Sequence, residues 1–134
     1  MARAVIIGVV GPCCAGKSTL VRALAARGCE VRHIAQEHSY APKMWQIIGK
    51  ADLLIFLDVS YEIGQRRRWM DWLPRDHDEQ RNRLRDARLN CDLYVDTDHL
   101  TAAEVFNVVF PFVSSHVDLA AQPETARRSP PKAA

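Results

Sequence analysis

The chain lacks an excess of charge of either sign. Its 134 residues contain 18 Lys and Arg and 16 Asp and Glu, which gives a formal net charge of +2 at pH 7. This balance does not indicate a polyanionic partner, so nucleic acid is not expected to be the main ligand. Hydrophobic residues make up 48% of the chain and charged residues 25%, which is typical of one ordinary globular domain.

Long apolar runs are also absent. The longest hydrophobic segment is far shorter than the roughly 20 residues of a membrane-spanning helix. The first residues lack the charged, apolar and cleavage regions of a secretory signal peptide. We therefore expect a cytoplasmic protein with no membrane partner. The domain is predicted to cover residues 1–117, and the Pro- and Ala-rich residues 118–134 predict a disordered tail.

The four cysteines show no Cys-x-x-Cys spacing and no His partner at the spacing of metal ligands. Cys13 and Cys14 are adjacent, and a disulfide between neighbours strains the backbone, so reduced thiols are expected. A second interpretation stays open for these two residues. A thiol at a helix N-terminus has a lowered pKa, so oxidation there could block an adjoining ligand site.

One motif stands out against these absences. Residues 11–19 match the phosphate-loop pattern GxxxxGK[ST], with a predicted buried strand at 4–10 before them and a predicted helix at 18–27 after them. Glycines at both ends let backbone N–H groups turn inward around a phosphate, and the helix directs its positive dipole end to the same place. We predict a nucleotide phosphate site formed by Gly11, Pro12, Cys13, Cys14, Ala15, Gly16, Lys17, Ser18 and Thr19.

Two side chains of this motif have predicted chemical roles. Lys17 adds a positive charge that reaches the outer phosphates of a nucleotide. The Ser18 hydroxyl can bind the magnesium ion that accompanies the nucleotide. We therefore expect Lys17 to be catalytic and Ser18 to be a metal ligand.

Further strands are predicted at residues 30–35, 52–58 and 92–96, with helices between them. A short helix before Gly49 is expected to place Met44, Ile47 and Ile48 on one apolar face. A capping box of Thr101 and Glu104 begins a last helix that is expected to end before Pro111. Strands alternating with helices predict an α/β fold.

Acidic side chains follow two of these strands. Glu37 comes after the second strand, and parallel strands place their ligands at the carboxyl edge of the sheet. Glu37 is predicted either to hold magnesium through water or to accept a proton from an attacking hydroxyl. Asp58, at the end of the third strand, is the weaker alternative. His38 is expected to be an ordinary loop residue.

Residues 62–92 contain eight arginines and seven acids. Pro74 divides the window into two helices, and Asp76 with Glu79 forms a capping-box pattern expected to start the second. Arginine forks clamp phosphate oxygens, so the window predicts a helical lid at about 62–91 that closes over a nucleotide. The alternative to a lid is a solvent-exposed helical hairpin whose arginines and acids form ion pairs with one another. One face of the second helix is predicted to carry Arg81, Arg85 and Arg88.

Helix phase alone does not decide which arginine of residues 66–68 touches phosphate. We assign Arg67 to the transferring phosphoryl group and Arg66 to the bound nucleotide. Trp69 and Trp72 beside them leave nucleic-acid contact as a minor alternative. After the last strand, the loop 97–100 with Asp98 lies on the same sheet edge and is expected to border the nucleotide base.

Taken together, the phosphate loop, the 53–57 strand with its arginine-bearing helix, and Tyr94-Val95-Asp96-Thr97 followed by Thr-Ala-Ala-Glu resemble small P-loop kinases of the adenylate and shikimate kinase type. The resemblance covers about 110 residues in outline, and its specific part is the phosphate loop. It implies a three-layer αβα sandwich of the P-loop NTPase superfamily that binds ATP with Mg²⁺. It also implies lid arginines on the phosphates and adenine near residues 96–99.

Those kinases usually have five parallel strands and a dedicated acceptor region, whereas four strands are predicted here, in the order 2-1-3-4 with right-handed crossovers. Two function classes stay open. The first is a kinase that transfers the γ-phosphoryl group of Mg-ATP to a small acceptor. The second is a nucleotide-dependent switch or slow ATPase that acts on a protein partner. The acceptor, the choice between ATP and GTP, and the oligomeric state are left open.

Overall fold

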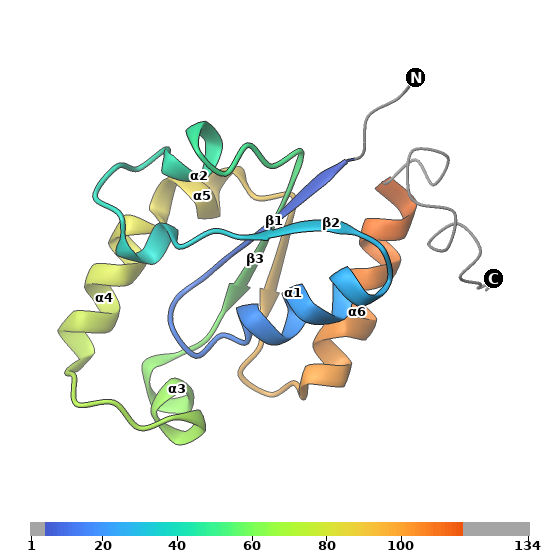
Figure 1. The fold of residues 1–134 in the computed structure, drawn as a ribbon. Helices are drawn as coiled ribbons and strands as arrows, with labels where there is room; N and C mark the ends of the chain where they lie inside the picture. The colour runs from blue at the N-terminus through green and yellow to red at the C-terminus, as the bar shows by residue number, and fades with distance from the viewer. Residues whose placement is uncertain (1–4, 117–134) are drawn as a thin grey trace.

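The computed structural model describes residues 5–116, and the tail predicted for 118–134 lies outside them. Strands and helices alternate along the chain, as Figure 1 shows. The elements in order are β1 (Ile6–Val10), α1 (Lys17–Ala26), β2 (Glu30–His33), the 3-10 helix η1 (Gln36–His38), α2 (Met44–Ile47), β3 (Leu53–Asp58), α3 (Tyr61–Arg67), α4 (Pro74–Arg83), α5 (Arg85–Asn90), β4 (Leu93–Asp96) and α6 (Ala102–His116).

The four strands form one parallel sheet in the order β2-β1-β3-β4, which confirms the predicted order (Figure 1). Val9 of β1 pairs with His33 of β2 on one side and Ile55 of β3 on the other. Because all strands run the same way, their carboxyl ends lie at one edge. The loops that follow the strands therefore gather at that edge.

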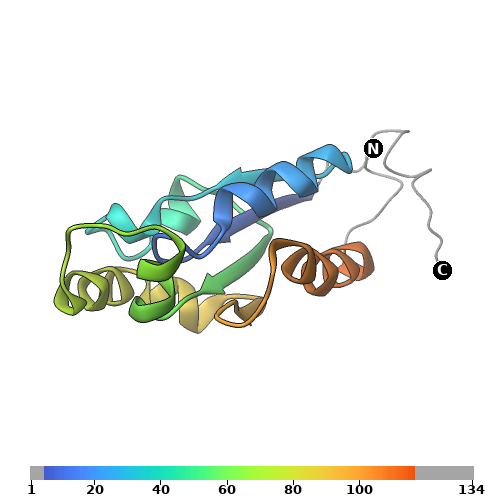
Figure 2. The ribbon, with the colours of Figure 1, turned by 90° about the horizontal axis from the view of Figure 1, so that it is seen from below.

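Helices cover both faces of the sheet, an arrangement compatible with the predicted three-layer sandwich. Ile7 and Val9 of β1 belong to a core cluster with residues of α1 and α6, whereas Val10 belongs to a second cluster with residues of α2, α5 and the α4–α5 junction. This division follows from the pleat, which points successive side chains to opposite faces. Figures 1 and 2 show α1 and α5 on opposite sides of the strands.

The two predicted helix boundaries at prolines differ from the structure. Helix α4 begins at Pro74, and Asp76 accepts a hydrogen bond of 2.7 Å from the Leu73 backbone N–H. The prediction that a capping box starts this helix at Asp76 was wrong. Asp76 is the third residue of α4, and its side chain caps the N–H of Leu73, the residue before the helix. Helix α6 continues through Pro111 to His116, so the expected end before Pro111 was also wrong.

Packing explains both the continuation of α6 and the altered face of α2. Val105, Val109 and Val113 recur every four residues and are buried against the sheet on either side of Pro111, so burial offsets the hydrogen bond that proline removes. In α2 the buried side chain is Trp45, whereas Ile47 and Ile48 are 66% and 70% exposed, contrary to the predicted apolar face.

Within residues 5–116, the helices are too short or too polar to cross a membrane.

Candidate functional site

The loop between β1 and α1 has a backbone that glycine alone accommodates at its start. Gly11 has φ of +152°, and a Cβ there would lie 1.9 Å from the carbonyl oxygen of Leu57 in the neighbouring β3. Cys14 and Gly16 also have positive φ, at 69° and 94°. The loop therefore turns tightly against the carboxyl end of β3, and any larger residue at position 11 would push it away.

Lys17, the first residue of α1, is buried and turned back into this loop. Its ammonium donates to the carbonyl oxygens of Gly11 at 2.7 Å and Pro12 at 2.9 Å. It also lies 3.1 Å from Oε2 of Glu37, which follows the neighbouring β2. An ammonium has three N–H donors, and these three oxygens use all of them.

The neighbouring residue Gln36 fixes the backbone that carries Glu37. The Gln36 side chain is fully buried, accepts from the Trp45 backbone N–H at 2.8 Å and donates to the Ala41 carbonyl at 2.8 Å. This anchors η1, and the Glu37 side chain is only 4% exposed. Its second oxygen, Oε1, is buried and has no hydrogen-bond partner among residues 5–116. The site thus contains one carboxylate oxygen available to a proton or a cation.

Asp58 occupies the corresponding place after β3, and both of its oxygens are engaged. Oδ1 accepts from the Val59 backbone N–H at 2.9 Å and from Arg81 at 3.2 Å, and Oδ2 accepts from the Tyr94 hydroxyl at 2.5 Å. Burial and the Asp58 carboxylate raise the pKa of Tyr94 to about 12. Of the two acidic candidates, Glu37 is the one whose geometry leaves an oxygen free.

Arg67 links the phosphate-loop motif to the connection between β4 and α6. Its guanidinium donates to the Cys14 carbonyl at 2.9 Å, to the Thr97 hydroxyl at 3.0 Å and to the Thr97 carbonyl. Arg66 is exposed and has no hydrogen bond or ion pair within the described chain, so its contact with a nucleotide stays a prediction. Asp98 accepts from the Ser60 backbone N–H at 2.8 Å and so supports the start of α3.

The three arginines of the second lid helix share a face, but α4 and α5 are separated at Leu84 and this face does not adjoin the phosphate-loop motif. They line a cavity of about 470 Å³ over β3, and no residue of 11–19 lines it. Arg81 pairs with Asp58, and the Arg88 guanidinium lies 5.2 Å from the centre of the Tyr94 ring. In this conformation their contacts are with the sheet edge rather than with the loop.

Gln80 of α4 is a contact that the sequence did not predict. Its Oε1 accepts from the Cys13 backbone N–H at 3.0 Å, and its Nε2 donates to the Cys13 thiol at 3.1 Å. The side chain is buried, at 5% exposure. Helix α4 therefore holds the loop by one of the amides expected to face a phosphate, and a glutamine in a polar helix gives no local signal of such a contact.

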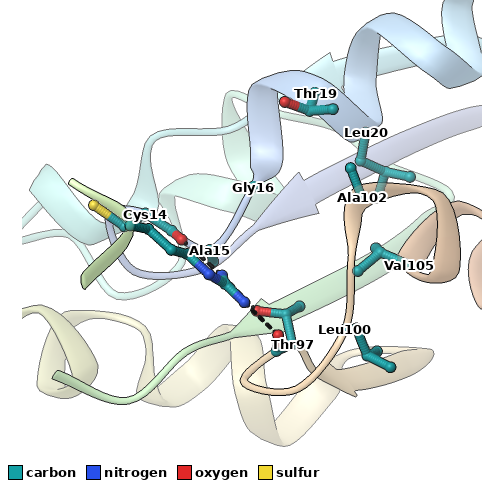
Figure 3. A pocket seen from close by; sticks show the side chains of 10 residues that line it. Cys14, Ala15, Gly16, Thr19, Leu20, Thr97, Leu100, Ala102 and Val105 are labelled. Carbon is teal, nitrogen blue, oxygen red and sulfur yellow. Dashed lines mark hydrogen bonds between the residues drawn. The ribbon is translucent and has the colours of Figure 1, made fainter. Parts of the chain in front are cut away.

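A cavity of about 210 Å³ adjoins the other side of the motif. Figure 3 shows Thr19 and Leu20 of α1 on one side of it and Leu100 and Val105 on the other, with Ala102 at the start of α6 drawn beside Leu20. Thr97 also lines the cavity, whereas Asp98 does not. The loop 97–100 thus borders this cavity through Thr97 and Leu100. That it borders a nucleotide base stays a prediction.

The cysteines differ from expectation in two ways. Burial raises the pKa of the Cys14 thiol, so the lowered pKa expected at the helix N-terminus was wrong for this residue. Cys13 does have a histidine neighbour, because its Sγ lies 3.9 Å from Nε2 of His38. Sequence spacing could not show this, since the two residues are brought together by the pairing of β1 with β2.

In comparisons with known proteins, no family model and no curated protein matches this chain.

Proposed function

We propose that the chain is a P-loop protein that binds Mg-ATP at residues 11–19 and transfers its γ-phosphoryl group to a small acceptor in the cytoplasm, where its cysteines stay reduced. The observation that carries the proposal is the position of Lys17. This buried ammonium lies at the start of α1, inside the glycine-bounded loop and beside the carboxylate of the adjacent strand. A lysine at a helix N-terminus within a glycine-bounded loop is placed to reach the outer phosphates of a nucleotide.

The proposed binding mode follows from the donors at this edge. Loop amides and the N-terminus of α1 provide donors for phosphate oxygens, and Lys17 provides positive charge. The Ser18 hydroxyl, which is exposed, and Glu37, with its unpartnered Oε1, are oxygen donors that fit Mg²⁺. When bound, Mg²⁺ neutralises charge on the phosphate chain.

Nucleotide binding would change the partners of Lys17. Because the ammonium already uses its three donors, it must release at least one oxygen to hold a phosphate. Release of Glu37 would leave both oxygens of its buried carboxylate without a partner among residues 5–116 other than His38. As the alternative to a role at Mg²⁺, Glu37 would then serve as the base that accepts the proton of the acceptor hydroxyl.

The nucleoside is proposed to occupy the 210 Å³ cavity beside Thr19. Apolar side chains of Leu20, Leu100 and Val105 line it, which suits the face of a base. Arg67 lies between this cavity and the loop, where its donors could pass from the Cys14 and Thr97 oxygens to phosphate. Such an exchange is the role proposed for it as a catalytic residue.

The switch alternative is favoured by the links between the helical segment and the loop. Gln80 of α4 holds Cys13, and Arg67 of α3 holds the Cys14 carbonyl. A phosphate that accepts from the Cys13 N–H and from the Arg67 guanidinium would break both links and release both helices. The helices could then present a different surface to a protein partner. The segment between β2 and β3 is also short, with only η1 and α2, which leaves little chain for an acceptor site.

The experiment that separates the two functions measures ADP production from Mg-ATP by wild type and Lys17→Ala. Nucleosides, nucleotides, sugars and small acids are supplied as acceptors. Turnover that depends on one acceptor and is lost in the variant supports the kinase and names its substrate class. Tight ATP binding with no acceptor effect supports the switch. Hydrogen exchange of α4 with and without ATP then tests whether the helix is released.

A further inference from the structure

Three side chains with metal-binding atoms converge beside the phosphate-loop motif. Cys13 comes from the loop after β1, and Glu37 and His38 come from η1 after β2. One ligand atom from each lies within 4.8 Å of the others. We propose that Cys13, Glu37 and His38 form a binding site for a borderline transition-metal ion, with Zn²⁺ as the best match.

The donor set decides the class of ion. A thiolate sulfur, an imidazole nitrogen and a carboxylate oxygen are together typical ligands of Zn²⁺, whereas Mg²⁺ and Ca²⁺ prefer oxygen alone. Three protein ligands leave the fourth position of a tetrahedral ion open to water or another small ligand. The site therefore differs in chemistry from the oxygen site proposed for Mg²⁺ at Ser18 and Glu37.

The distances fit this geometry after small movements. A tetrahedral Zn²⁺, with bonds of about 2.3 Å to sulfur and about 2.0 Å to nitrogen or oxygen, separates its ligand atoms by roughly 3.3 to 3.5 Å. The Cys13 Sγ lies 3.9 Å from His38 Nε2, which lies 3.6 Å from Glu37 Oε2. All three ligand atoms lie within 4.8 Å of one another, so the two pairs with His38 need shifts of a few tenths of an ångström, and Cys13 and Glu37 approach by up to about 1.4 Å. The His38 side chain is 60% exposed and free to follow this movement.

The Glu37 carboxylate gives an independent reason to expect a cation. Its Oε1 is buried without a partner among residues 5–116, while Oε2 contacts Lys17. An ion bound by both oxygens of this carboxylate, of which Oε2 lies 3.6 Å from His38 Nε2, would give the unpaired Oε1 a partner.

Gln80 adds support around the first ligand. Its amide donates to the Cys13 thiol at 3.1 Å and accepts from the Cys13 backbone N–H, which fixes the direction of the sulfur. This contact lies outside the proposed metal ligands and orients the sulfur toward Glu37 and His38. The exposed His38 leaves a route by which an ion can enter from solvent.

The test uses the full chain, reduced and stripped with EDTA, in the absence of nucleotide. Co²⁺ is added as a spectroscopic substitute for Zn²⁺, because a cobalt–thiolate bond gives a charge-transfer band that oxygen ligands do not give. Zn²⁺ affinity is then measured by competition. We expect one ion per chain and a thiolate band that is lost in Cys13→Ser, with Zn²⁺ binding at least 100-fold weaker in Cys13→Ser and in His38→Ala.

Cys14→Ser is the matched control, since Cys14 is the adjacent thiol and is not part of the cluster. It should keep the cobalt band and the Zn²⁺ affinity of wild type. Circular dichroism and thermal melting in EDTA confirm that each variant is folded. Equal Zn²⁺ affinity in Cys13→Ser and wild type, or equal loss in both cysteine variants, would overturn the site. Because no nucleotide is present, this result is independent of the proposed ATP chemistry.

Discussion

The ammonium of Lys17 lies 3.1 Å from the carboxylate of Glu37, and both side chains are buried. The two residues follow neighbouring parallel strands, β1 and β2, so the sheet itself sets their approach. A buried ion pair of this kind adds little net stability to the fold, but removing one of its two partners is strongly destabilising. The pair is therefore both a structural contact and the place where a phosphate would compete for the lysine.

Lys17→Met should lower the free energy of unfolding by about 3 kcal/mol, because it leaves the Glu37 carboxylate buried without its counter-charge. Adding Glu37→Gln should recover part of this loss, since a neutral amide needs no counter-charge. Urea denaturation of both single variants and the double variant measures this coupling. Strictly additive losses would show that the two side chains do not interact in solution.

If the proposed kinase activity is present, Arg67→Ala should lower acceptor-dependent ATP turnover by about tenfold or more, because Arg67 donates to the Cys14 carbonyl of the motif. Arg66→Ala should have a smaller effect, since Arg66 makes no hydrogen bond or ion pair within the described chain. Arg75→Ala removes an exposed arginine of α4 and serves as the control with wild-type rates. Initial rates at saturating Mg-ATP decide the order, and a larger loss at Arg66 would contradict it.

Tyr94→Phe should lower the free energy of unfolding by about 1 kcal/mol, because it removes the 2.5 Å hydrogen bond to buried Asp58. ATP affinity should not change, since Asp58 is engaged in structure. The raised pKa of Tyr94, about 12 against an ordinary 10, means that folding favours the neutral phenol. Its stability contribution is present below pH 10 and is lost as the pH rises toward 12, so Tyr94→Phe should unfold less steeply in alkali.

His77 should make stability fall in mild acid. It is buried between Tyr61 and Trp72, and its Nε2 has no partner within the described chain. Burial and then the Arg81 charge lower its pKa from the ordinary 6.5, against weaker raising effects of Asp58, Asp78 and Glu62. The contribution is present above pH 6.5 and is lost as the pH falls through the lowered folded pKa, since the unfolded chain binds the proton more readily.

The measurement is the melting temperature between about pH 7.5 and about pH 5.5, which spans the ordinary histidine pKa. His77→Phe keeps the aromatic contacts and removes the titrating group. Its melting temperature should fall less than that of wild type over this range. An equal fall in both proteins would assign the acid sensitivity to other groups.

The sheet and its order could be predicted because buried parallel strands leave a strong sequence signal. The runs around Val9 and Ile55 are apolar and β-branched, and their carboxyl ends had to share an edge once the strands were parallel. The neighbourhood of Lys17 and Glu37 followed from that reasoning. The helix boundaries near Pro74 and Pro111 did not. Asp76 caps α4 as its third residue rather than starting it, and burial of the valines of α6 carries that helix through Pro111.

Contacts made by single side chains across the fold were beyond the sequence. Gln80 reaches Cys13 only because α4 packs against η1 beside the motif, and nothing in the polar sequence of α4 marks that residue. The approach of Cys13 to His38 has the same origin in strand pairing. Arg67 could be named within a run of three arginines, but its partners Cys14 and Thr97 are set by where α3 ends.

The most direct test of the central claim is the affinity for Mg-ATP, measured by titration calorimetry for wild type, Lys17→Met and Lys50→Met at a temperature where all three are folded. Lys50 is exposed and precedes β3 at the amino edge of the sheet, away from the motif. The account predicts one ATP site, at least tenfold weaker binding in Lys17→Met and unchanged binding in Lys50→Met. Equal affinity in all three proteins, or no ATP binding by wild type, would contradict it.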